Sequence, residues 1–228
     1  MFMSHYATEV CKCPFFCLPL QLTTLLNKIV NMTIEDKILA AAEEEFYCFG
    51  FDATSTSRIA KSVGVTHAMV NYYFRTKEQL FLGVLDSHVE KAIVVLRDIM
   101  RGHGGMEETV TRTAAALFGL FNEDRSFPFL LLDASRSHPE YLARYRESLL
   151  ASAKGILDGH AGRLKDSIED GNVTGLFETV LTLAYTPFLH IPFLTNVAGY
   201  SEQDVDDYLQ RRKAEMLMLL TKRYSNAN

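Results

Sequence analysis

The chain has 228 residues with 23 basic and 28 acidic side chains, which gives a formal net charge of −5 at pH 7. This length is enough for one or two domains with a hydrophobic core, and the 48% hydrophobic and 22% charged content is ordinary for a globular protein. The acidic balance excludes a protein that coats nucleic acid through bulk charge, so an anionic partner must be met by a local basic patch.

Residues 1–31 are interpreted as an extension, either disordered or a misassigned upstream start, with the working protein beginning near Met32. The uncharged run 13–27 resembles a signal peptide at first sight. It is too short for a membrane span, contains two prolines and lacks a small-x-small cleavage site. We therefore expect neither a secreted nor a membrane protein.

The cysteines give no clear disulfide framework, because three of the four lie in the first seventeen residues and none follows Cys48. Cys48 is expected to be a small core residue. A zinc site is the alternative for the first three with His5, but their spacing matches no common zinc pattern. The cysteine usage favours a reducing compartment, the cytoplasm, with no metal and no cofactor.

Helical periodicity dominates after Met32 and strand signals are nearly absent, which predicts an all-α fold. Thr33 followed by Asp36 is typical of a capping box that begins the first helix, and Gly50 is a fitting stop for it. Gly64 is expected to end a second short helix, and Thr66 to cap the third. About nine helices are predicted, at 34–49, 56–63, 67–74, 77–101, 106–121, 127–135, 139–170, 176–196 and 201–223.

Residues 56–75 predict two helices joined by a tight turn. Ala60 is small where the helices would cross, and Gly64, four residues later, permits the positive φ of a sharp turn. Together these positions indicate a helix-turn-helix in a front domain of residues 32–80, followed by a helical domain of residues 81–228. The remaining core positions of the motif are Ile59, Val63, Val65 and Val70.

The stretch from Ala53 to Lys77 contains four basic residues and no acidic one, a local charge of +4 in a chain of −5. Phosphate attraction requires such an asymmetry. With Val70 and Phe74 inward, the second helix of the motif is expected to project His67, Ala68, Asn71 and Tyr72, flanked by Met69 and Tyr73. Asparagine can form two hydrogen bonds with one adenine in the major groove.

Each of these residues has a plainer interpretation. Tyr72 and Tyr73 could pack against the protein, and His67 could be an ordinary exposed polar residue. Arg58 and Lys61 could be solvated surface. The DNA hypothesis therefore depends on the whole set, and the alternative function is a helical protein-interaction module without specific DNA binding.

Residues 38–81 resemble the DNA-binding unit of tetracycline-repressor-type (TetR/AcrR family) transcriptional regulators. The resemblance implies phosphate contacts at Thr56, Tyr72 and Lys77. Position 71 departs from the family, which usually has tyrosine where this chain has Asn71, so we assign the backbone-holding aromatic to Tyr72. The matching residues are Ile38, Ala41, Phe46, Gly50, Thr54, Ile59, Ala60, Gly64, Val65, Tyr72, Phe74, Lys77 and Leu80. The candidate DNA-binding residues are Thr56, Ser57, Arg58, Thr66, His67, Ala68, Met69, Asn71, Tyr72, Tyr73 and Lys77.

The rear domain follows from no motif, and the resemblance implies a helical regulatory domain that binds an unknown small-molecule effector. Aromatic residues gather in its helices, and ligand pockets are mostly apolar. A plain aromatic core is the alternative. The candidate effector-binding residues are Phe118, Phe121, Phe129, Tyr141, Tyr145, Tyr185 and Phe188.

Segments 176–196 and 201–223 are apolar on most faces, so a core or a second subunit must cover them. Pro187 and Pro192 are expected to bend or end the first of them. We predict a homodimer joined by a four-helix bundle of residues 176–223, which fits a reader of palindromic DNA. Its mechanism would be ligand-induced movement of helix 77–101, with repression as the default direction.

A hydrolase is the rival reading. Residues 133–138 place Asp133, Ser135, Ser137 and His138 close together, but catalytic triads are assembled in space and no nucleophile-elbow pattern is present. This run is more simply a helix end and a turn before Pro139. The chain is therefore expected not to be an enzyme.

Overall fold

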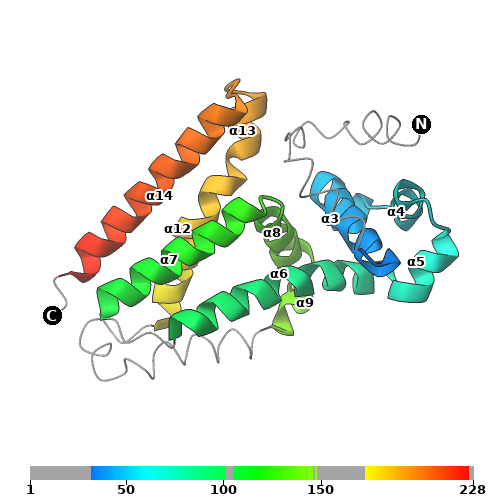
Figure 1. Ribbon diagram of the computed structural model, residues 1–228, viewed down its shortest axis with the longest axis horizontal. Helices are drawn as coiled ribbons and strands as arrows, with labels where there is room; N and C mark the ends of the chain where they lie inside the picture. Colours follow the sequence, from blue (N-terminus) through cyan, green and yellow to red (C-terminus); the bar gives the residue numbers. More distant parts are fainter. Residues whose placement is uncertain (1–31, 101–104, 146, 148–172, 226–228) are drawn as a thin grey trace. The chain divides into compact units, whose positions relative to one another are not determined.

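The computed structural model describes residues 32–100, 105–145, 147 and 173–225, and these residues form helices and no strand (Figure 1). The predicted all-α class is therefore confirmed. The extension, the candidate zinc ligands and most of predicted helix 139–170 lie outside the described residues. The helices, labelled as in Figure 1, are α3 (Ile34–Ala53), α4 (Thr56–Val63), α5 (His67–Phe74), α6 (Lys77–Met100), α7 (Met106–Glu123), α8 (Phe127–Ser137), α9 (Pro139–Ala143), α12 (Val173–Leu189), α13 (Ile191–Asn196) and α14 (Glu202–Tyr224).

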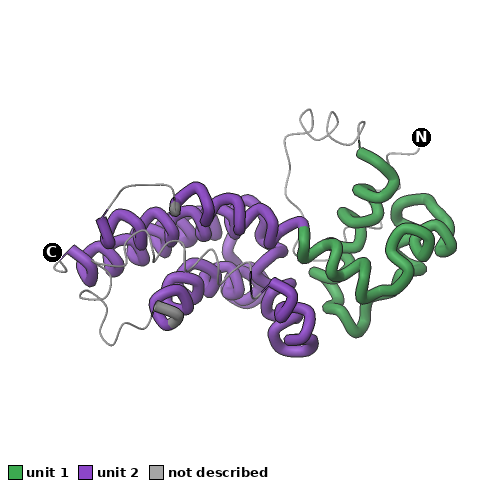
Figure 2. Tube along the Cα trace, turned by 90° about the horizontal axis from the view of Figure 1, so that it is seen from below, with its two compact units in different colours: residues 1–86 green, residues 87–228 purple. Residues whose placement is uncertain are grey.

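The chain divides into two compact units, residues 1–86 and residues 87–228 (Figure 2). The division falls inside α6, between Asp86 and Ser87, whereas the sequence placed the boundary after residue 80. Unit 1 therefore contains α3, α4, α5 and the first part of α6.

The start of α3 is the predicted capping box. Thr33 Oγ1 accepts a hydrogen bond from the Asp36 N–H at 3.1 Å, and the Asp36 carboxylate accepts from the Thr33 N–H at 3.0 Å. Hydrogen bonds from the Thr33 side chain and backbone lower the pKa of Asp36. Gly50 has a φ of 72° and kinks the helix, which then continues to Ala53. The predicted stop at Gly50 is thus a kink.

The turn between α4 and α5 has the predicted geometry. Gly64 is the C-cap of α4 with a φ of 75°, where a side chain would be strained. The Val65 N–H donates to the Ala60 carbonyl at 3.0 Å. Thr66 Oγ1 accepts from the Met69 N–H at 3.2 Å and so caps α5. The bounds of α5 agree with the predicted helix 67–74.

The core of unit 1 forms where these helices meet the start of α6. Ile59, Ala60 and Val70 are buried as predicted, while Val63 and Val65 are half-buried. The Phe81 ring of α6 contacts two aromatic rings of α3, with centroid distances of 4.8 Å to Phe46 and 5.2 Å to Phe51. This core anchors one face of α4 and α5 and leaves the other face outward.

In unit 2, α7 packs against α12 and α14, and α12 also contacts α8 (Figure 1). Pro187 is buried inside α12, which ends at Leu189. His190 separates it from α13, which has Pro192 in its first turn. The predicted helix 176–196 is therefore two helices. Ser201 caps α14 and, with Asp204, forms a second capping box.

Two expectations are wrong. The helix that begins at Pro139 ends at Ala143 instead of continuing unbroken, because residues 144–145 turn. Cys48, the one cysteine among the described residues, is half-buried in α3 and disulfide-bonded, so it is not the small core residue that was expected. Among the described residues, no helix combines the length and apolar character needed to cross a membrane.

Candidate nucleic-acid interface

Helix α5 has one buried face and one exposed face. Val70 and Phe74 are 2% and 8% exposed and hold the helix against unit 1. His67, Ala68 and Asn71 are exposed, and Tyr72 is 81% exposed. The flanking residues are less open, since Met69 is half-buried and Tyr73 is 36% exposed. The outward set predicted from the sequence therefore lies on one accessible surface.

His67 is hydrogen-bonded on both ring nitrogens. Its Nε2 lies 3.0 Å from Thr56 Oγ1, and its Nδ1 lies 3.3 Å from Asn71 Nδ2. Thr56 is the first residue of α4 and Asn71 is one turn along α5. The sequence named all three residues separately. His67 and Asn71 are four residues apart on one helix, a spacing that brings side chains together, whereas the contact of Thr56 with His67 depends on how closely α4 and α5 pack.

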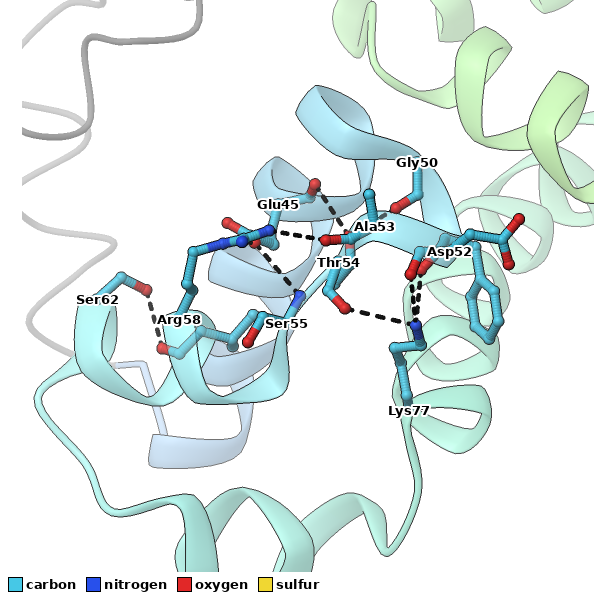
Figure 3. Close-up of polar contacts among 11 residues, drawn as sticks. Glu45, Gly50, Asp52, Ala53, Thr54, Ser55, Arg58, Ser62 and Lys77 are labelled. Atoms are coloured by element: carbon cyan, nitrogen blue, oxygen red, sulfur yellow. Dashed lines mark hydrogen bonds and ion pairs between the residues drawn. The ribbon is translucent and has the colours of Figure 1, made fainter.

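Arg58 is engaged within unit 1. Its Nε donates to the Glu45 carboxylate of α3, and its Nη2 donates to the Ala53 carbonyl at 2.9 Å (Figure 3). The guanidinium also lies 4.6 Å from the centroid of the Phe49 ring. Glu45 therefore neutralises a charge that the sequence assigned to the basic patch.

Lys77 is also engaged within unit 1. Its Nζ donates to three backbone carbonyls, those of Phe51 at 2.9 Å, Asp52 at 3.2 Å and Thr54 at 3.4 Å (Figure 3). The same atom lies 4.6 Å from the centroid of the Phe51 ring. An ammonium group has three donors, and all three meet acceptors at the end of α3. A phosphate contact at Lys77 would thus come from its backbone N–H at the start of α6.

The basic patch is therefore smaller than the sequence suggests. Lys61 and Arg75 are exposed and form no ion pair within the described part of the chain. Hydroxyl groups and helix starts supply the remaining donors: Thr56 and Ser57 begin α4, and Thr66 caps α5. Such donors, with the positive end of a helix dipole, suit a phosphate.

Four of the seven candidate effector-binding residues lie together between α7 and α12. Phe188 is fully buried, and its ring centroid is 4.9 Å from that of Phe118 and 6.0 Å from that of Phe121. Tyr185 is 6.4 Å from Phe121. The other three candidates are on neither of these helices: Phe129 is half-buried on α8, Tyr141 is on α9, and the buried Tyr145 follows α9.

The run 133–138 ends α8 instead of forming a triad. The Ser135 hydroxyl donates to the Leu131 carbonyl at 2.6 Å, and Arg136 pairs with Asp133 at 3.4 Å. His138 Nδ1 lies 3.4 Å from Glu140, and the ring stacks on Tyr141. These contacts join residues within four positions of one another, as a helix end and the following turn would.

Helix α14 has apolar side chains on two faces. Met216 and Leu220 are 3% and 2% exposed, whereas Met218 is 63% and Leu219 is 55% exposed. On α13, Phe193 is also exposed. The core of unit 2 thus covers only one side of the run that the sequence described as apolar all round.

Residues 38–84 match the family described as bacterial regulatory proteins, tetR family. The HTH-type transcriptional regulator RutR of Escherichia coli (strain K12) is 29% identical over 133 residues, which are 58% of this chain and 56% of RutR. The HTH-type transcriptional regulator QacR of Staphylococcus aureus is 40% identical over 60 residues, 26% of this chain and 32% of QacR. The chain therefore spans little more than half the length of the first and about a third of the second.

Solved structures share the fold over more of the chain. A regulatory protein of the tetR family from Rhodococcus RHA1 has a TM-score of 0.66 at 17% identity, covering 85% of this chain and 98% of that one. A transcriptional regulator from Streptomyces coelicolor has a TM-score of 0.61 at 22% identity, covering 82% and 96%. At these identities the likeness concerns the fold of both units.

Proposed function

We propose that this chain, whose N-terminal unit belongs to the tetR family of bacterial regulatory proteins, is a ligand-responsive transcriptional regulator that binds a palindromic DNA operator as a homodimer. The observation that carries the proposal is the geometry of α5. Buried Val70 and Phe74 fix one face of the helix, while His67, Asn71 and Tyr72 stand exposed on the other. A helix presented in this way fits the major groove of B-DNA. A regulator that binds chromosomal DNA of a bacterium would act in the cytoplasm.

In this function the candidate residues divide into two roles. Thr56, Thr66, Tyr72 and the start of α6 at Lys77 contact phosphates and fix the register of the protein on DNA. Lys61 and Arg75 supply free positive charge to the same surface. The residues that face base edges are Ser57, His67, Ala68, Met69, Asn71 and Tyr73.

The homodimer forms through residues 176–223. Met218 and Leu219 are large apolar side chains that the described chain leaves open to water, and a second copy of α14 would cover them. A twofold axis would place two α5 helices about 34 Å apart, the spacing of successive major-groove turns. Replacing Met218 by Lys should lower the sedimentation coefficient to that of a monomer, while Lys222→Ala on the same helix should leave the dimer intact.

Repression is the default direction, with an effector that binds in unit 2 among Phe118, Phe121, Tyr185 and Phe188. These rings contact one another, so an effector would have to separate them. Residues of α6 belong to both units, and a shift of this helix would change the spacing of the two reading helices. A ligand acts in this way only if it binds one spacing better than the other.

Selection of bound sites from a pool of random duplexes tests the proposal. The dimer should enrich a palindrome, and Asn71→Ala should remove the preference at one position of each half-site. A protein-interaction module without specific DNA binding would enrich no sequence, even at low ionic strength. That result would overturn the DNA function.

A further inference from the structure

His67 joins the two helices of the motif through a chain of three exposed polar side chains. Thr56 of α4 contacts the Nε2 edge of the ring, and Asn71 of α5 contacts the Nδ1 edge, at 3.0 Å and 3.3 Å. Both distances are within hydrogen-bond range. The two ends of this chain are residues with different proposed roles, a phosphate contact at Thr56 and a base contact at Asn71.

The chemistry of these atoms fixes the proton on the ring. An amide nitrogen can only donate, so Nδ1 of His67 must accept from Asn71 Nδ2. The imidazole is then neutral and carries its proton on Nε2, which donates to Thr56 Oγ1. The Thr56 oxygen accepts this bond, and its own hydroxyl hydrogen remains available for a phosphate.

The same bond decides how Asn71 faces the groove. The carboxamide has two N–H donors and one carbonyl oxygen, and one N–H is used by His67. The remaining N–H and the oxygen are the donor and acceptor that adenine takes at N7 and N6. If the amide were turned round, its oxygen would face His67, and the donor and acceptor that face the groove would exchange positions, so they would no longer match adenine N7 and N6.

We propose that His67 is a positioning residue that sets the base preference of Asn71 for adenine and links this base contact to the phosphate contact of Thr56. The inference rests on the proposed DNA-binding function. It assigns His67 an effect on specificity that acts through Asn71, in place of a base contact of its own.

The experiment is site selection from random duplexes, followed by competition between the selected site and the same site with guanine in place of the adenine. It uses the full chain at a single pH and ionic strength. The variants are His67→Ala, His67→Gln and Asn71→Ala, each checked for helix content and thermal midpoint. The ratio of the two affinities is the readout, because general effects of charge on DNA binding cancel in it.

We expect the wild type to prefer adenine by about fivefold or more, the usual minimum for a two-bond base contact. His67→Ala should lose most of this preference, and His67→Gln should keep it because its amide offers one acceptor and one donor. Asn71→Ala should show no preference.

The failures are distinguishable. If the wild type selects no sequence, the DNA function and this inference fall together. If the wild type selects a palindrome but His67→Ala keeps the adenine preference of the wild type, the DNA function stands and the inference is overturned. A selected palindrome whose adenine does not depend on Asn71 overturns it as well.

Discussion

Lys77 is expected to stabilise unit 1 and not to hold DNA phosphate through its ammonium group. The three carbonyls that accept from Nζ, at 2.9, 3.2 and 3.4 Å, belong to Phe51, Asp52 and Thr54. Lys77→Met keeps a stem of similar length and removes the charge. Phe51 and Asp52 lie in the last turn of α3 and Thr54 is its C-cap, so we expect the variant to loosen the helix pair α3 and α4 that supports α5.

The size of the effect follows from these contacts. Hydrogen bonds to a charged group contribute about 1.5–3 kcal/mol, and an exposed cation over an aromatic ring about 0.5–1 kcal/mol. The bonds share one half-buried ammonium and the longest is weak, so they do not add. We expect Lys77→Met to lower the free energy of unfolding of unit 1 by about 2 kcal/mol. Hydrogen exchange at amides of α3 and α4 measures this, because it reports the opening of these helices themselves.

DNA binding gives the decisive comparison. Each phosphate contact that is lost lowers the slope of log K against log salt by about 0.9. Lys77→Met, measured at a temperature where unit 1 is folded, should leave this slope unchanged, whereas Lys61→Ala should lower it. A Lys77→Met protein with normal hydrogen exchange and a slope smaller by about 0.9 would show that Nζ leaves the carbonyls for a phosphate, and the argument would be refuted.

Three further predictions concern charge, backbone and pH. Glu45→Gln should free Arg58, so DNA affinity at low salt and the salt slope should both rise in fluorescence anisotropy titrations. Gly64→Ala should destabilise unit 1 by about 1–2 kcal/mol in the same hydrogen-exchange assay, because an alanine meets no atom within 4 Å but must adopt a φ of 75°. Hydrogen bonds from Ser201 lower the pKa of Asp204 in the folded state, so its contribution to stability is complete above the ordinary aspartate pKa of about 3.9 and is lost as the pH falls through the lower folded value. Asp204→Asn should therefore melt below the wild type at pH 7 and approach it in acid, and a difference that grows in acid would contradict this.

Local sequence signals predicted the parts of the structure that local chemistry determines. Thr33 with Asp36, Gly64 and Thr66 each fix a helix end through bonds within five residues, and all three have the predicted role. The family resemblance rests on the same segment and is confirmed by the match of residues 38–84. The role of Gly50 was predicted only in part, because whether a helix ends or continues after a positive φ depends on packing.

Contacts between helices were not predictable in the same way. The pairing of Arg58 with Glu45 and of Lys77 with the end of α3 joins residues 13 to 26 positions apart. No periodicity links them, because the separation is set by the kink at Gly50 and the crossing of α3 with α4. The contact of Thr56 with His67 likewise joins two helices, so the sequence could place each residue on its helix but not in contact.

These contacts change how an acidic chain would bind DNA. Residues 53–77 contain four basic side chains, and two of them, Arg58 and Lys77, are bound within unit 1. In each subunit the positive charge available to DNA therefore comes from Lys61 and Arg75. Charge of that size gives weak binding to any single duplex region, because non-specific affinity grows with the number of phosphates neutralised. Operator affinity must then depend more on the oriented hydrogen-bond donors at the starts of α4 and α5. It must also depend on the dimer, because two linked DNA-binding units that bind together raise the affinity without new contacts. The chain would thus bind random DNA poorly and a correctly spaced palindrome well. A regulator needs such a preference, because a genome offers many competing non-specific sites.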